Sequence, residues 1–168
     1  MTKNFERAAR RYRAVFAEIA REAPLREQQR IPPYEQIDWL REAGFGAARI
    51  AREAGGDGLS FEELFRLWVE LAEADSNIAH ALRGHFEFVE VRLQHSDPEV
   101  RAFWVERIVR NRELVGNAWS EKSNEARRST STSVSADAEG RLLLNGTKHF
   151  STGTLYADWI DVLADVDG

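Results

Sequence analysis

The spacing of apolar residues changes once along the chain, near residue 112. Up to that point apolar residues recur every three or four positions, which is the period of a helix with one buried face. Beyond it, short runs such as "RLLLN" and "ADWIDVLA" stand between Gly, Ser, Thr and Asp residues, a pattern typical of strands and turns. The sequence therefore predicts an α+β chain, with an all-helical domain over residues 1–112 and the start of an antiparallel β-barrel or sandwich domain over residues 113–168.

Five helices are expected before residue 112. The first places its large apolar residues on a single stripe, with Arg and Glu on the other side. A later one begins at Ser60, which stands three residues before Glu63 at the spacing of a capping box. The stripe comprises Phe5, Tyr12, Phe16 and Ile19, and the face of the later helix that we expect to be largely buried comprises Phe61, Leu64, Phe65, Trp68 and Leu71.

The final residues, "ADVDG", come directly after an expected strand. A sheet of three or four strands that stops at this point has uncovered edges and one unfinished face. We therefore expect either a fragment of a longer protein or a chain that other chains complete.

The composition limits the kinds of partner. The net charge is −5 with acidic and basic residues interleaved, so we expect no binding to nucleic acid. The chain has no cysteine and its histidines show no metal-ligand spacing, so we expect no metal site. The N-terminus lacks the apolar core of a signal peptide, and no run is long enough to cross a bilayer. A soluble cytoplasmic protein that binds small molecules or proteins, and no membrane, is expected.

His85 lies on the apolar side of a predicted helix, in line with Leu82 and Val89. An imidazole at such a position can act as a general acid or base in a cavity. The alternative is a core histidine whose ring is satisfied by a backbone carbonyl. The sequence leaves both interpretations open.

Two segments of the β region combine residue types that suit a flat heterocycle, "GNAWSE" and "GTKHFSTG". A planar amphipathic ring needs an aromatic or apolar face and a few fixed donors and acceptors. The alternative for the second segment is an ordinary turn between strands. The candidate residues are Asn117, Trp119 and Ser120 in the first segment and Phe150, Ser151 and Thr152 in the second.

Read together after a helical half, "GNAWSE", "LLLNGTKHFSTG" and "ADWIDVLA" resemble the acyl-CoA dehydrogenase superfamily over nearly the whole chain. The resemblance implies an N-terminal helical domain, a middle β domain and a C-terminal four-helix bundle, the last of which this chain lacks. It also implies that the aromatic and hydroxyl residues of the second motif lie against a flavin ring. Phe150 would pack on the isoalloxazine and Thr152 would hydrogen-bond its reactive edge. The residues implied at the pyrimidine end of the ring are Asn117, Trp119 and Ser120.

The dehydrogenases of this superfamily follow their Thr-Glu pair with a Pro-Gly-x-Gly-Ser-Asp stretch, whereas this chain continues from Ser120 and Glu121 with "KSNEARRSTST". It is therefore more similar to the flavin-dependent monooxygenase branch, typified by dibenzothiophene monooxygenase. This similarity implies reduced FMN supplied by a flavin reductase, and a small substrate oxygenated by O2 at sulfur, nitrogen or carbon. The groups implied around the reacting oxygen are His85, Asn117 and Thr152.

Two alternatives remain, an FAD-dependent acyl-CoA dehydrogenase and an inactive truncated fragment or paralogue. The resemblance also implies a homo-oligomer, a dimer or a tetramer, in the full-length form. In the family the flavin site is closed by the C-terminal helices and by a neighbouring subunit. We therefore expect the 168-residue chain to be inactive by itself.

Overall fold

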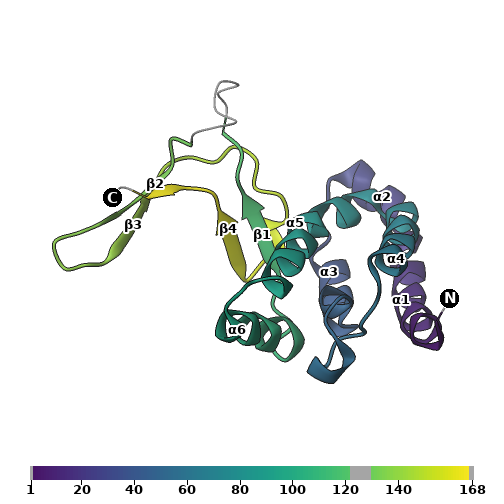
Figure 1. Cartoon of the computed structure of the whole chain (residues 1–168). Helices are drawn as coiled ribbons and strands as arrows, with labels where there is room; N and C mark the ends of the chain where they lie inside the picture. The colour runs from purple at the N-terminus through teal and green to yellow at the C-terminus, as the bar shows by residue number, and fades with distance from the viewer. Residues whose placement is uncertain (1, 122–129, 167–168) are drawn as a thin grey trace.

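A computed structural model describes residues 2–121 and 130–166 of the chain. Figure 1 shows the helices gathered on one side and the strands on the other, with α5 next to β1. None of the helices described is long and apolar enough to cross a membrane. The helices are α1 (Lys3–Arg21), α2 (Ala23–Gln29), α3 (Tyr34–Glu42), α4 (Phe61–Ala74), α5 (Ser76–Leu93) and α6 (Pro98–Val109).

The helical core forms around Phe45, which lies in a short 3-10 turn between α3 and α4. Its ring makes edge-on contacts with Tyr12 and Phe16 of α1, at centroid distances of 4.9 and 5.6 Å. Phe86 of α5 contacts it from another side at 5.3 Å. The predicted stripe of α1 is confirmed, because all four of its members are at most 4% exposed. The first helix thus packs through the face that its sequence indicates.

The helical part has one element more than the sequence analysis predicted. Residues 23–29 form α2, so the described chain has six α-helices where five were expected. Glu22 leaves the helical conformation at the end of α1, and Pro24 stands in the first turn of the new helix. A proline is tolerated at that position because its missing N–H has no partner there in any helix. The helix ends at Arg30, whose backbone is left-handed (φ 54°).

The start of α4 is as predicted, but the expected burial of its apolar face is wrong in part. Ser60 accepts a hydrogen bond from the N–H of Glu63, and the Glu63 carboxylate accepts one in return from the N–H of Ser60. Phe61 and Phe65, however, are 55% and 51% exposed, because they line an open groove beside α5. The buried residues of α4 are Leu64, Leu67 and Leu71.

The strands form two small sheets with mixed pairing, which corrects the expectation of a wholly antiparallel region. β2 and β3 form an antiparallel hairpin, whereas β1 pairs with β4, and β2 with β5, in parallel. The hairpin separates β1 from β4 in the sequence, so the chain can return to β1 in the same direction. No closed barrel forms within the part that the structure describes. The strands are β1 (Val115–Ala118), β2 (Ser133–Ala136), β3 (Leu142–Asn145), β4 (Trp159–Val162) and β5 (Asp165–Val166).

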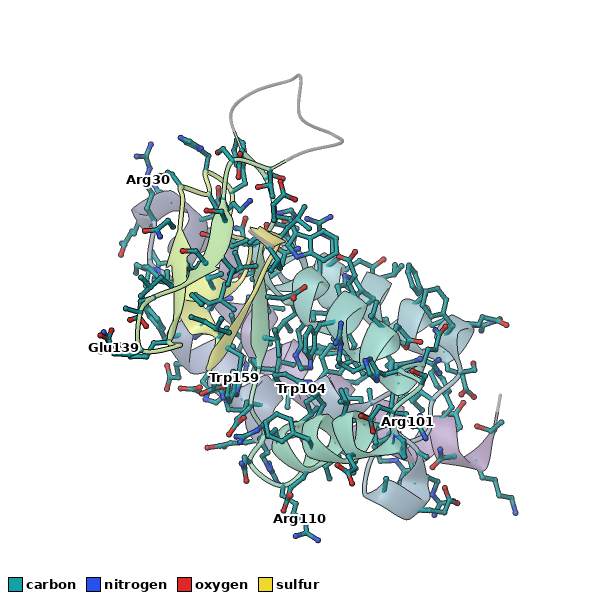
Figure 2. All side chains as sticks on the ribbon, turned by 60° about the vertical axis from the view of Figure 1, so that its left-hand side comes forward. Arg30, Arg101, Trp104, Arg110, Glu139 and Trp159 are labelled. Carbon is teal, nitrogen blue, oxygen red and sulfur yellow. The ribbon has the colours of Figure 1, made fainter. Side chains whose placement is uncertain are left out.

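The strands are joined to the helices by an arginine of α3 and by a pair of tryptophans. Arg41 forms an ion pair with Asp158 at 2.5 Å and donates a hydrogen bond to the carbonyl of Tyr156 at 2.9 Å. Figure 2 shows Trp104 of α6 beside Trp159 of β4, and their rings meet edge-on at 5.4 Å. These contacts fix the first sheet, which consists of β1 and β4, against the helices.

Candidate functional site

The fold brings the two candidate segments side by side. Ser120 and Phe150 form an isolated antiparallel bridge, and the N–H of His149 donates to the carbonyl of Ser120 at 3.0 Å. At the other end of the pairing, the N–H of Asn117 donates to the carbonyl of Thr152 at 3.1 Å. Residues 117–120 and 149–152, which are about 30 positions apart in the sequence, therefore form one backbone unit.

Large side chains of this paired unit remain exposed. Phe150 is 67% exposed and Trp119 is 40% exposed. Ser120 and Ser151 are also exposed, and Thr152 is half-buried. Solitary exposed aromatic residues are common on protein surfaces, but here two of them stand beside hydroxyl groups on a hydrogen-bonded backbone. This arrangement can present an apolar face together with several donors and acceptors.

Asn117 and Trp119 also line a small cavity of about 200 Å³ between α5 and the first sheet. Gly84 of α5 is part of its wall, and a Cβ at this position would lie 3.0 Å from Cγ of Asn117. The absence of a side chain at position 84 thus makes room for the amide. The other residues of the wall include Phe88, Val91 and Leu163, which make most of it apolar.

A carboxylate that the sequence analysis did not select holds the Trp119 indole. Its Nε1–H donates to Asp161 of β4 at 3.0 Å. Asp161 is aligned with Asn117 across the parallel pair β1–β4, so both face the same side of the sheet. The spacing of "ADWIDV" identifies a strand but not its partner, so this contact could not be found from the sequence.

His85 does not join the paired segments. Its ring is 1% exposed, Nδ1 accepts a hydrogen bond from the N–H of Val115 at 3.2 Å, and Nε2 lies 3.0 Å from the carbonyl oxygen of Gly46. Since Val115 can only donate, Nε2 carries the proton and donates to Gly46. Burial lowers the pKa of His85 to about 4. The ring therefore has the surroundings of the core histidine that the sequence left open as the alternative.

The two glycines that bound "GTKHFSTG" each lie against a distant part of the chain. Gly153 has a left-handed backbone (φ 79°), and a Cβ there would lie 2.2 Å from the carbonyl oxygen of Ala81. A Cβ on Gly146 would lie 2.4 Å from the hydroxyl oxygen of Thr132. Gly146 does not form the hairpin turn that an Asn-Gly pair favours, because the turn between β2 and β3 lies at residues 137–141 instead.

An ion pair that the sequence analysis missed stands at the end of the paired unit. Nζ of Lys148 lies 2.7 Å from Oε1 of Glu121, with both side chains only 8% and 10% exposed. Both residues belong to the quoted motifs, but Lys and Glu side chains are usually exposed, so the sequence indicates no partner for either. Their proximity depends on the pairing of Ser120 with Phe150.

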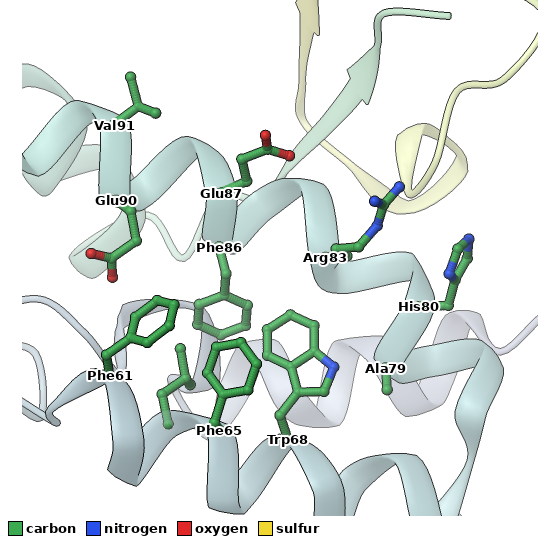
Figure 3. Close-up of a pocket in the computed structure, with 11 residues that line it drawn as sticks. Phe61, Phe65, Trp68, Ala79, His80, Arg83, Phe86, Glu87, Glu90 and Val91 are labelled. Atoms are coloured by element: carbon green, nitrogen blue, oxygen red, sulfur yellow. The ribbon is translucent and has the colours of Figure 1, made fainter.

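A separate groove of about 570 Å³ runs between α4 and α5. Figure 3 shows the rings of Phe61, Phe65 and Trp68 turned toward Phe86, while Glu87 points away from them. The candidate residues of the β region and His85 are not among the described residues that line it. This groove explains why the apolar face of α4 remains partly open.

Residues 2–112 match the family described as "Acyl-CoA dehydrogenase, N-terminal domain". The chain belongs to the acyl-CoA dehydrogenase family. This membership, shown by the helical part of the chain, confirms the superfamily that the sequence resembles.

Within this acyl-CoA dehydrogenase family, the chain is similar to monooxygenases. Dibenzothiophene monooxygenase of Mycolicibacterium goodii is 27% identical over 124 residues, which cover 74% of this chain and 30% of that protein. The probable FMNH2-dependent monooxygenase SfnC of Pseudomonas putida is 29% identical over 106 residues, or 63% of this chain and 27% of SfnC. The structure of FMN-bound TdsC from Paenibacillus sp. A11-2 matches with a TM-score of 0.81 at 30% identity, over 96% of this chain and 40% of TdsC. The resemblance to the monooxygenase branch is thereby confirmed, and the chain spans less than half the length of these relatives.

Proposed function

We propose that this chain forms part of the flavin site of an FMN-dependent monooxygenase that oxygenates a small sulfur-, nitrogen- or carbon-containing substrate with O2. The similarity to SfnC and to FMN-bound TdsC supports the choice of FMN. The observation that carries the proposal is the exposed Phe150 ring on the backbone unit formed by residues 117–120 and 149–152. The proposal further includes a flavin reductase as a partner, a homo-oligomeric full-length form and a cytoplasmic location.

The residues present fit a flavin. An isoalloxazine is a flat ring system with an apolar face and polar edges, and such a ligand needs an aromatic platform with a few convergent polar groups. Phe150 supplies the platform. Hydroxyl donors and acceptors come from Ser120, its partner in the bridge, and from Ser151 and Thr152, which directly follow it. When bound, reduced FMN supplies the electrons for activating O2, which no amino-acid side chain can provide.

The side chains of this unit then have separate roles. Phe150 contacts the ring face, and Thr152 and Ser120 orient its polar edge. Asn117 and Trp119 face the cavity against α5, where the amide can hold a polar atom of the ligand. The apolar side chains that line part of this cavity, Phe88, Val91 and Leu163, would exclude water from that side of the bound ligand.

His85 contributes to the proposed site by position. Both of its ring nitrogens are engaged with backbone atoms, and its lowered pKa keeps the ring neutral near pH 7. A neutral, doubly hydrogen-bonded ring is a poor proton donor. We therefore propose that it holds the start of β1, through Val115, against the turn that contains Gly46.

A titration of the chain with FMN tests the proposal, with binding measured by the quenching of flavin fluorescence. Phe150→Ala should weaken binding by about two- to tenfold, since a stacked aromatic contact contributes about 0.5–1.5 kcal/mol. Phe103→Ala, which truncates a half-exposed phenylalanine on α6, serves as the control and should leave the affinity unchanged. Equal affinity of the Phe150→Ala variant and the unmodified chain would contradict the assignment.

The same titration with FAD decides between the two flavins. The proposal predicts tighter binding of FMN, whereas the alternative of an FAD-dependent dehydrogenase predicts the reverse. With a flavin reductase, FMN and dibenzothiophene as the probe substrate, the chain alone should give no turnover, because it spans 30% of its dibenzothiophene monooxygenase relative.

A further inference from the structure

Lys148 and Glu121 form an ion pair that is nearly shielded from water. Nζ of Lys148 lies 2.7 Å from Oε1 of Glu121, and the two side chains are 8% and 10% exposed. Exposed pairs on the same chain, such as Arg141 with Glu139, have side chains that are 74% and 66% exposed. A shielded pair is little screened by salt, and removing one partner leaves the other charge without its counterion.

Glu121 is also the acceptor for a whole segment of backbone. Its Oε2 accepts from the N–H and the hydroxyl of Ser131 at 2.9 and 2.7 Å. Its Oε1 accepts from the N–H and the hydroxyl of Thr132 at 3.1 and 2.8 Å, and from the hydroxyl of Thr130. The hydrogen bond from Lys148, followed by those from Thr130 and Ser131, holds the pKa of Glu121 well below its usual range. The carboxylate is therefore ionised near neutral pH.

This ion pair joins three segments of the chain at one end of the proposed flavin platform. Glu121 directly follows Ser120, and Lys148 directly precedes His149, whose N–H donates to Ser120. Lys148 also donates to the hydroxyl of Thr130 at 2.6 Å. The pair thus lies beside the bridge between Ser120 and Phe150 and connects the two segments that form it.

We propose that Lys148 and Glu121 are positioning residues that fix the location of the Phe150 ring, and this inference rests on the proposed function. Because the ring is 67% exposed, packing of its own side chain does not determine where it lies. Its location depends on the backbone bridge, and the ion pair holds that bridge in register. Neither Lys148 nor Glu121 needs to touch the flavin for this role.

The test compares Lys148→Met, which keeps the length of the side chain but removes its charge, with Lys148→Arg, which keeps the charge. Two quantities are measured in each variant: hydrogen exchange of the His149 amide, and FMN affinity. Lys148→Met should accelerate exchange at His149 about tenfold or more and weaken FMN binding to a similar extent, with exchange in α1 unchanged. Lys148→Arg should restore most of both. Arg141→Met, which breaks an exposed ion pair of the β2–β3 turn, is the matched control and should change neither.

A second variant covers the case in which Lys148→Met unfolds the chain. Ser131→Ala removes one hydroxyl donor to Glu121 and leaves both charges in place, so it should accelerate exchange at His149 about threefold. Unchanged exchange at His149 in Ser131→Ala and Lys148→Met, or equal effects of Lys148→Met and Lys148→Arg, would overturn the inference. If the unmodified chain bound no FMN, the proposed function would fail, whereas the exchange at His149 would still decide whether the ion pair holds the bridge.

Discussion

His85 connects the helical part to the first strand through its two ring nitrogens, with Nε2 3.0 Å from the carbonyl oxygen of Gly46 and Nδ1 3.2 Å from the backbone nitrogen of Val115. Only the neutral ring can make both hydrogen bonds, because a protonated imidazole has no acceptor for the Val115 N–H. Protonation of His85 therefore breaks a contact between the two parts of the chain.

The first prediction is that the titration of His85 lowers the stability of the chain in mild acid. Burial lowers the pKa of His85 from 6.5 to about 4, so between these two pH values the unfolded chain binds a proton that the folded chain does not. The free energy of unfolding should fall by up to roughly 3 kcal/mol as the pH drops through this window. Urea unfolding at pH 7.5 and pH 4.5 measures this loss. His85→Gln, whose amide can donate to Gly46 and accept from Val115 without titrating, should lose less stability over the same window. The same loss in the variant and in the unmodified chain would rule out His85 as the cause.

The second prediction concerns the turn that ends the "GTKHFSTG" motif. Gly153→Ala should lower the free energy of unfolding by about 2 kcal/mol or more, because it combines a left-handed backbone with a clash against the carbonyl of Ala81. Gly140→Ala is the matched control, since Gly140 has the same left-handed backbone (φ 77°) but no atom within 4 Å of the added Cβ. It should cost about 1 kcal/mol. Similar losses in both variants would show that the contact with α5 is unimportant.

The third prediction concerns the join between helices and strands. Asp158 accepts hydrogen bonds from Arg41 at 2.5 Å and from the N–H of Leu114 at 2.8 Å, and Arg41 also reaches the carbonyl of Tyr156. Arg41→Met should therefore accelerate hydrogen exchange of the Leu114 amide and lower the free energy of unfolding by about 1–3 kcal/mol. Arg110→Met, which removes an exposed ion pair on α6, should stay within about 0.5 kcal/mol of the unmodified chain. A similar small change in Arg41→Met would show that the ion pair does not hold the sheet.

The local sequence pattern was sufficient to predict the elements that depend on neighbouring residues, such as one helical turn or one apolar stripe. The stripe of α1 and the capping box at Ser60 depend only on residues three to seven positions apart, and both are found as predicted. The second helix was missed because Glu22 interrupts a helical pattern that continues on either side of it. The half-exposed Phe61 and Phe65 were misjudged because an apolar face predicts burial without saying which element covers it.

The candidate site divides in the same way. The motifs identify residues 117–120 and 149–152, and the structure brings these segments together. The side chains that hold those segments could not be predicted, because their contacts join residues 27 or more positions apart in the sequence. They are Asp161, Glu121 and Lys148. The orientation of the His85 ring depends on Gly46, which is 39 residues away in the sequence. The apolar periodicity of the helix that carries His85 therefore does not predict this orientation.

The most direct test of the flavin site is a titration of the isotope-labelled chain with FMN, followed by NMR of the backbone amides. The proposal predicts saturable shifts concentrated at residues 117–120 and 149–152, with α1 and the α4–α5 groove unaffected. The Phe150→Ala variant should show the same pattern only at higher FMN concentrations. Shifts centred on the groove lined by Phe61 and Phe65, or no shifts at millimolar FMN, would contradict the account.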